Sequence, residues 1–231
     1  MKTFVIFDLD GTLLNTIDDL ATATNHALTT LGYPPHGMWV YPTLVGNGVA
    51  KLIERALPAE AREEKNIRAA LEVFRAYYDE HCCDKTVPYP GIPELLEELT
   101  SRGVNLAVTS NKYEAAVTKI ISHYFPSANF RAVLGNVDGI PRKPDPSIVF
   151  KALSMCPTPK AEVLYVGDSG VDIETARRAC VDSVGVTWGF RPISELTAAF
   201  ADHIVSTASQ ILDLVEEKTS SPERRARGED V

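Results

Sequence analysis

Short apolar runs alternate with helix-like segments along most of this chain, and few folds can accommodate that alternation. Between the runs, apolar residues recur at helical spacing, as in Ile92, Leu95 and Leu99. Alternating strands and helices predict a parallel sheet with helices on both faces, so we expect an α/β fold with a Rossmann-like core. The runs are rich in β-branched and aromatic residues, as buried strands are, and they span residues 2–7, 104–110, 131–135, 161–167, 182–187 and, more weakly, 202–206.

One long segment contains helical patterns but no convincing strand. Apolar residues at helical spacing predict one helix near residues 17–31 and a second near 49–57, with further helix in 59–81. We therefore expect a helical cap domain at residues 15–87, inserted after the first strand of a catalytic core formed by residues 1–14 and 88–217. The tail at residues 218–231 lacks apolar periodicity, so we expect it to be flexible.

Composition argues against several classes of protein. Of the 231 residues, 45% are hydrophobic and 23% are charged, as in an ordinary globular protein. The net charge of −8 and the lack of a basic stripe argue against a nucleic-acid partner. No apolar stretch approaches the length of a membrane span, and the first run is too short for a signal peptide. Cysteines without a C-x-x-C pair fit reduced thiols, so we expect a cytoplasmic protein with no membrane partner.

Polar side chains follow four of the predicted strands, at or soon after the point where each strand ends. In open parallel sheets, ligands bind outside the carboxyl ends of the strands, so we expect these side chains to converge at one edge. In chain order they are Asp8 and Asp10, then Ser110 and Asn111, then Lys143 in a loop, and finally Asp168.

Asp8 and Asp10 stand two residues apart on an extended chain, so their carboxylates point to the same side. Two like charges so close repel each other unless a cation lies between them. Mg²⁺ fits this role, because it prefers oxygen ligands and binds through one or two carboxylates plus a substrate phosphate. Asp8, Asp10 and Asp168 could supply those ligands. A carboxylate can also act as a nucleophile and form an aspartyl-phosphate, so this set of residues predicts phosphoryl transfer.

The remaining candidates fit a phosphate site, although most also have a structural explanation. Gly11 would let the backbone approach a phosphate because it has no Cβ, and Ser110 with Lys143 could neutralise the phosphate oxygens. Ser110 and Asn111 could instead cap the next helix, and Lys143 could be a solvated loop lysine. Asp172 has the S-x-x-D spacing of a capping box, so it could be structural as well.

Four segments resemble, in order, the four motifs of the haloacid dehalogenase superfamily of phosphohydrolases. They are DLDGTL from Asp8, TSN from Thr109, KPDP from Lys143 and GDSGVDIETA from Gly167, and the similarity extends from residue 2 to about residue 179. Three further segments resemble the phosphoglycolate phosphatase branch: VGNGVAKLIERAL in the insertion, PYPGI at its exit, and GVTWGF from Gly185.

The resemblance implies a role for each matching residue. Asp8 would be the nucleophile and Asp10 the general acid and base. Two positions depart from the family's pattern: Asn15 stands where relatives usually have Asp, and Cys180 where they usually have Gly. The implied Mg²⁺ ligands are Asp8, the Asp10 backbone carbonyl and Asp168, with Asp172 in support, and the implied phosphate-binding residues are Gly11, Thr12, Ser110, Asn111 and Lys143.

Two basic residues of the predicted cap could reach the substrate. Lys51 and Arg55 are four residues apart and share one face of a predicted helix, where Arg55 could bind the end of the substrate that lacks the phosphoryl group. A solvated helix face is the alternative. The turn at residues 46–48, before that helix, could direct backbone N–H groups at an anion or be an ordinary loop.

These features together predict a phosphoric monoester hydrolase: a Mg²⁺-dependent phosphatase that acts on a small phosphorylated metabolite through an aspartyl-phosphate. Phosphoglycolate is the favoured substrate by resemblance. The alternatives within the superfamily are a phosphosugar mutase and a pyrophosphatase or nucleotidase. A non-catalytic aspartyl-phosphate switch is an alternative from another class, although receiver modules are much shorter and lack a helical insertion after the first strand.

Overall fold

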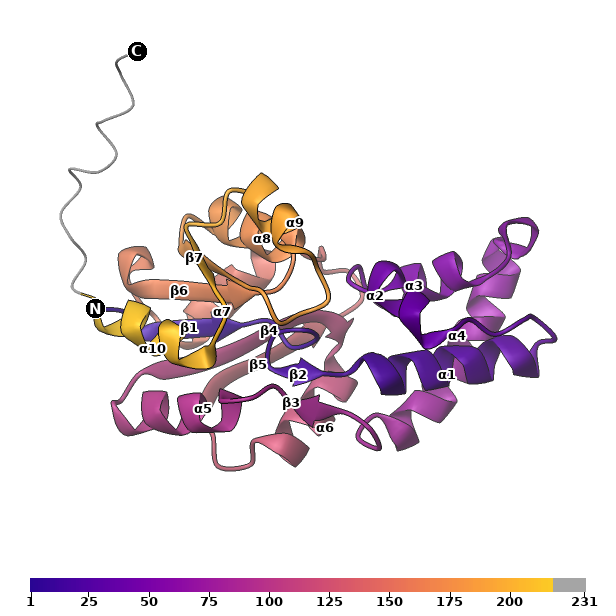
Figure 1. The fold of residues 1–231 in the computed structure, drawn as a ribbon, viewed down its shortest axis with the longest axis horizontal. Coiled ribbons are helices and arrows are strands. Elements are labelled where there is room, and N and C mark those ends of the chain that lie inside the picture. Colours follow the sequence, from indigo (N-terminus) through magenta and orange to yellow (C-terminus); the bar gives the residue numbers. More distant parts are fainter. Residues whose placement is uncertain (218–231) are drawn as a thin grey trace, which may run out of the picture.

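Six strands form one sheet in the computed structural model, which describes residues 1–217 (Figure 1). They are β1 (Phe4–Phe7), β4 (Asn105–Tyr113), β5 (Phe130–Asn136), β6 (Val163–Gly167), β7 (Asp182–Val186) and β8 (His203–Val205). Their spatial order is β5-β4-β1-β6-β7-β8, and every neighbouring pair is parallel. The six predicted strands and the parallel sheet are therefore confirmed, while the tail expected to be flexible lies outside the described residues.

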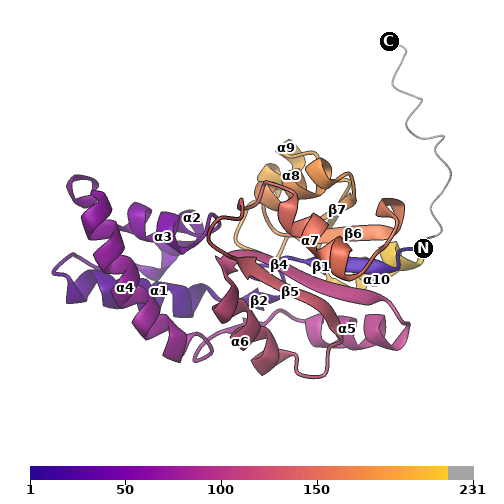
Figure 2. The same cartoon turned by 180° about the vertical axis from the view of Figure 1, so that it is seen from behind.

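The sheet is buried because helices cover both of its faces (Figure 2). In β1, Val5 and Phe7 contact one apolar cluster while Phe4 and Ile6 contact the other. Continuous apolar runs of this kind are typical of parallel strands with two covered faces. Within residues 1–217, no helix has the length and apolar content needed to cross a bilayer. The first face is covered by α5 (Ile92–Ser101), α6 (Glu114–Tyr124) and α10 (Ala208–Glu216), the second by α7 (Ser147–Met155) and α8 (Gly170–Ala179), with α9 (Ile193–Ala198) beside α8.

A helical segment leaves the sheet after β1 and returns before α5. It starts at β2 (Leu14–Asn15) and ends at β3 (Val87–Pro88), two strands that pair antiparallel. Figures 1 and 2 show it as a second lobe beside the sheet. Neither short strand is predicted from the sequence, because two residues are too few to show an alternating pattern. The segment contains α1 (Ile17–Thr30), α2 (Tyr41–Leu44), α3 (Val49–Ala56), α4 (Glu64–His81) and 3₁₀ turns at Met38–Val40 and Ala59–Ala61.

Asp19 fastens the two ends of this segment to each other. It lies in α1 with its side chain buried. Its carboxylate accepts hydrogen bonds from the backbone N–H groups of Lys85 and Thr86 and from the Thr86 hydroxyl, at 2.8 to 3.1 Å. A buried carboxylate is tolerated where hydrogen bonds replace those it made with water. These bonds hold the start of α1 against the chain that returns to β3. The chain that enters the helical segment and the chain that leaves it are therefore bonded to each other.

Asp19→Ala should lower the free energy of unfolding by about 3 kcal/mol, because buried N–H groups that lose a charged acceptor keep their desolvation cost. Urea unfolding followed by circular dichroism measures this loss. Asp18→Ala is the matched control, since Asp18 is exposed in the first turn of the same helix. Asp18→Ala should lose only a helix-dipole contribution of less than about 1 kcal/mol. Equal losses in the two variants would contradict the role of Asp19.

Candidate active site

The carboxyl ends of β1, β4 and β6 form the floor of a cavity. The predicted residues at the strand ends line it together, which confirms that they converge at one edge of the sheet. They are Asp8, Asp10, Ser110, Asn111, Lys143 and Asp168, and Asp172 lines the cavity beside them. The opposite wall belongs to the helical segment and includes Leu20, Val45, Val49, Leu52, Phe74 and Tyr78.

Lys143 joins the elements of the floor through its buried ammonium group. Its Nζ donates to Asp8 Oδ1 and to Asp172 Oδ1, each at 2.7 Å, and to the Thr109 carbonyl at 3.1 Å. The Asn111 side chain fixes the Lys143 backbone: its Oδ1 accepts from Lys143 N at 2.9 Å, and its Nδ2 donates to the Lys143 carbonyl at 3.2 Å. The alternative that Lys143 is a solvated loop lysine is therefore wrong.

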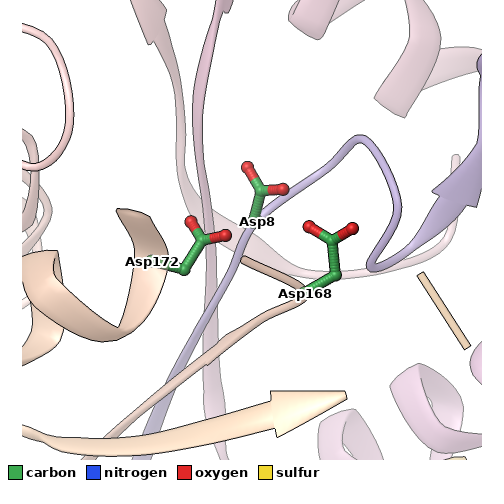
Figure 3. A group of neighbouring side chains, drawn as sticks. All are labelled: Asp8, Asp168 and Asp172. Carbon is green, nitrogen blue, oxygen red and sulfur yellow. The ribbon is translucent and has the colours of Figure 1, made fainter. Parts of the chain in front are cut away.

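Three buried carboxylates gather on this floor (Figure 3). One oxygen atom from each of Asp8, Asp168 and Asp172 lies within 4.8 Å of the others. Burial raises the pKa of Asp168 to about 7, and the nearby Asp172 adds to the shift. Burial also raises the pKa of Asp8 well above its usual value, against the opposing effect of Lys143. Three acids that share one ammonium group leave a surplus of negative charge, which a divalent cation with oxygen ligands would offset.

Asp168 lies where Gly11 and Gly189 leave room for it. Its Oδ2 accepts a hydrogen bond from Phe190 N at 2.7 Å. A Cβ atom on Gly11 would lie 2.3 Å from Asp168 Oδ2, and one on Gly189 would lie 2.2 Å from Asp168 Cβ. Gly11 also has a φ of +89°, a conformation that favours glycine. Position 11 therefore needs glycine to accommodate Asp168, a reason distinct from the predicted approach to a phosphate.

Asp172 has two structural contacts. At the start of α8 it forms a capping box with Ser169, in which each side chain accepts from the backbone N–H of the other residue, and the Ser169 Oγ also donates to Asp172 Oδ2 at 2.6 Å. Its other oxygen, Oδ1, accepts from Lys143. The capping alternative for Asp172 is confirmed, and both of its oxygens already have donors. The corresponding alternative for Ser110 and Asn111 is wrong, because within the described chain the start of α6 has no side-chain cap.

The Asp10 side chain contacts the helical segment and not the other acids. Its Oδ1 accepts from the Thr16 hydroxyl at 2.6 Å and lies 3.0 Å from Lys112 Nζ. Lys112 is buried and also donates to the Tyr78 hydroxyl of α4, at 2.9 Å. Neither Lys112 nor Tyr78 is among the predicted site residues. The sequence feature that could identify Lys112 as a site residue is its position at the end of a buried strand, because lysine is almost never fully buried unless it is paired.

Besides Gly11, three candidates for substrate binding do not line the cavity. Arg55 donates to the Leu44 carbonyl at 2.9 Å and to Asn47 Oδ1 at 2.6 Å. Lys51 makes an exposed ion pair within α3, as the solvated-face alternative predicts. Thr12 is fully buried, and its hydroxyl has no hydrogen-bond partner among residues 1–217. Arg55 therefore does not line the cavity, and its guanidinium bonds residues 44 and 47 within the helical segment.

Arg191, in the loop after β7, holds the same wall from the side of the sheet. Its Nη1 donates to the Pro42 carbonyl at 2.9 Å, and its Nη2 donates to the Val45 carbonyl at 2.6 Å. Arg55 holds residues 44 and 47 from within the helical segment, so residues 42–48 are fastened from both sides. Arg191 and Val45 are 146 residues apart, and no local pattern in the sequence indicates their contact.

Known proteins resemble this chain along most of its length. A family model described as haloacid dehalogenase-like hydrolase matches residues 5–186. The phosphoglycolate phosphatase of Pseudomonas fluorescens is 38% identical over 208 residues, which cover 86% of this chain and 75% of that protein. The phosphoglycolate phosphatase of Aquifex aeolicus is 35% identical and covers 92% of this chain and 96% of its own length. A crystal structure from Lactobacillus delbrueckii subsp. bulgaricus has a TM-score of 0.88 at 34% identity, covering 94% of this chain and 100% of that one.

Gly11→Ala should destabilise the protein more than Gly32→Ala. Their φ angles are +89° and +79°, so both variants carry similar backbone strain, about 1–2 kcal/mol. Only at Gly11 would the added methyl group meet Asp168, while no described atom lies within 4 Å of the corresponding position at Gly32. We expect the free energies of unfolding in urea to differ by at least about 1 kcal/mol, because overpacking a tight site is costly. Equal values would show that Asp168 moves aside freely.

Proposed function

The chain belongs to the haloacid dehalogenase-like hydrolase family, and we propose that it hydrolyses a small phosphomonoester through an aspartyl-phosphate on Asp8. It is a phosphoric monoester hydrolase, as its family and its phosphatase relatives indicate. One observation carries the proposed mechanism. The Lys143 ammonium lies 2.7 Å from Asp8 Oδ1, so a cation stands beside the carboxylate that would attack phosphorus and can receive the anionic ester.

The donor set on the cavity floor fits Mg²⁺. Asp8 and Asp168 supply carboxylate oxygens at a point of surplus negative charge, and the Asp10 backbone carbonyl is the third proposed ligand. Asp172 would support the site indirectly, because both of its oxygens already accept hydrogen bonds. When bound, Mg²⁺ would offset the charge of the acids and of the phosphoryl oxygens.

Asp8 must be ionised to attack phosphorus. Burial raises its pKa, while the Lys143 ammonium favours the ionised form, so the two effects oppose each other at the nucleophile. One Asp8 oxygen accepts from Lys143, and the other could attack in line with the leaving oxygen. Ser110 and Lys143 would then hold the phosphoryl oxygens, and Asn111 would keep Lys143 in place.

Asp10 is the proposed general acid and base. Its carboxyl group would protonate the leaving oxygen and then take a proton from the water that attacks the aspartyl-phosphate. The Thr16 hydroxyl and the Lys112 ammonium orient that carboxyl group. Because Thr16 directly precedes α1, the acid is tied to the helical segment as well as to the sheet.

We assign residues 15–87 to a cap domain and residues 1–14 with 88–217 to the catalytic core. In support, the helical segment supplies the wall opposite the acids, and β2 with β3 forms the crossing between the two parts. The cap would therefore select the substrate. Phosphoglycolate is the favoured substrate, because the relatives from Pseudomonas fluorescens and Aquifex aeolicus are named for its hydrolysis. Phosphate release from a panel of phosphorylated metabolites, with Mg²⁺ present, tests this choice.

Asp8→Asn should abolish turnover and covalent labelling together, because it removes the nucleophile. Asp10→Asn should keep the nucleophile but lose proton transfer, which lowers the rate about 10²–10⁴-fold. An aryl phosphate needs little acid to expel its leaving group, so with this substrate Asp10→Asn should accumulate label on Asp8. Rapid quench with labelled nitrophenyl phosphate, followed by peptide mapping, measures both effects. Label on another residue, or turnover by Asp8→Asn, would refute the assignment.

Mg²⁺ should bind more tightly as the pH rises through 7. In the metal-free protein the Asp168 pKa is about 7, so at lower pH this carboxyl group carries a proton that must leave before it can bind the ion. Each pH unit below this pKa should weaken binding about tenfold, and the dependence should level off above it. Calorimetric titration across this range, in two buffers, measures affinity and proton release. An affinity that does not change with pH would contradict Asp168 as a ligand.

A further inference from the structure

Lys112 brings a second buried cation into the cavity. Its side chain is 4% exposed, and its ammonium lies 3.0 Å from Asp10 Oδ1 and 4.7 Å from the centre of the Tyr78 ring. Among residues 1–217, the Tyr78 hydroxyl is the one group that accepts a hydrogen bond of full geometry from this ammonium, at 2.9 Å. An ammonium group has three N–H donors. Lys112 therefore retains donors for a ligand.

The other cations of the cavity contact groups other than Asp10. Lys143 Nζ already bonds two carboxylates and a backbone carbonyl. The Arg191 guanidinium donates to two backbone carbonyls of the helical segment. Of the lysine and arginine side chains that line the cavity within the described part of the chain, Lys112 is the one that forms an ion pair with Asp10, the proposed acid.

Lys112 lies beside the residue that would meet the leaving oxygen. Asp8 and Lys143 mark the phosphoryl end of the proposed site, and Asp10 meets the leaving oxygen. The Lys112 ammonium lies 3.0 Å from Asp10 Oδ1 and donates to the Tyr78 hydroxyl of the helical segment, so a group carried close to the leaving oxygen could contact this ammonium. Apart from Tyr78, the side chains of the helical segment at this wall are apolar and offer an anion no partner.

We propose that Lys112 binds a carboxylate of the substrate. The site would then select phosphomonoesters in which the carbon bearing the ester oxygen also bears a carboxylate. The Tyr78 hydroxyl accepts from Lys112 and can donate its own proton to the same carboxylate. This inference rests on the proposed function, because it takes Asp8 and Asp10 as the reacting groups.

The test compares 2-phosphoglycolate with 2-hydroxyethyl phosphate, which lacks the carboxylate but has a similar size, in the Mg²⁺-loaded wild type and in Lys112→Met. The preference for phosphoglycolate, taken as the ratio of kcat/KM values, should fall at least about 30-fold in the variant, because hydrogen bonds to a charged group are lost. Lys112→Arg should restore part of the preference. Lys151→Met, which removes a half-exposed lysine of α7, should leave it unchanged.

Equal losses on both esters would overturn the inference, because Lys112 would then act only through Asp10. Calorimetric binding of both esters to Mg²⁺-loaded Asp8→Asn protein, with and without Lys112→Met, separates the inference from the proposed function. A wild type that hydrolyses neither ester, with a binding preference that Lys112→Met removes, would refute the proposed hydrolysis of phosphoglycolate and uphold the inference. A binding preference that survives Lys112→Met would refute the inference whatever the turnover. Lys112→Gln, which keeps a polar end without the charge, replaces Lys112→Met if that variant does not fold.

Discussion

A single buried ammonium group holds the floor of the cavity together. Lys143 bonds the Asp8 carboxylate at the end of β1 and the Asp172 carboxylate at the start of α8, elements that meet only in the folded chain. Removing one partner from such a buried pair typically costs about 3–5 kcal/mol, because it leaves a charge without compensation. The arrangement that the proposed cation and phosphoryl group require is therefore set by a structural interaction before either of them arrives.

The sheet and its acidic edge could be predicted from the sequence, whereas the opposite wall could not. Each buried strand is a continuous apolar run, and the polar residues at strand ends converge once the sheet is parallel. Lys112 and Arg191 depend instead on partners 34 and 146 residues away, for which no local pattern exists. Arg55 shows the same limit, because helical spacing assigns it a face but not the neighbour that this face meets.

The two lobes contribute differently to the site, and Asp10 is where they meet. The floor comes from the sheet and carries the proposed nucleophile, cation ligands and phosphoryl contacts. The wall comes from the helical segment and is apolar except at Tyr78. Asp10 belongs to the floor, but its carboxyl group also accepts a hydrogen bond from Thr16, at the start of the helical segment. Lys112 contacts the same carboxyl group and donates to Tyr78 in α4, the last helix of that segment. The proposed proton transfer and the proposed substrate selection therefore depend on one group.

The strands that lead into and out of the helical segment lie side by side, with Leu14 opposite Pro88. An insertion whose ends are adjacent leaves the parent fold undisturbed, and lengthening it adds little closure entropy. Evolution can therefore lengthen, shorten or replace residues 16–86 by recombination while β1 and β4 keep their register, with Phe4 opposite Asn105. Descendants of such an exchange would inherit the proposed nucleophile and the acids around it and would diverge in the groups that orient Asp10 and line the opposite wall.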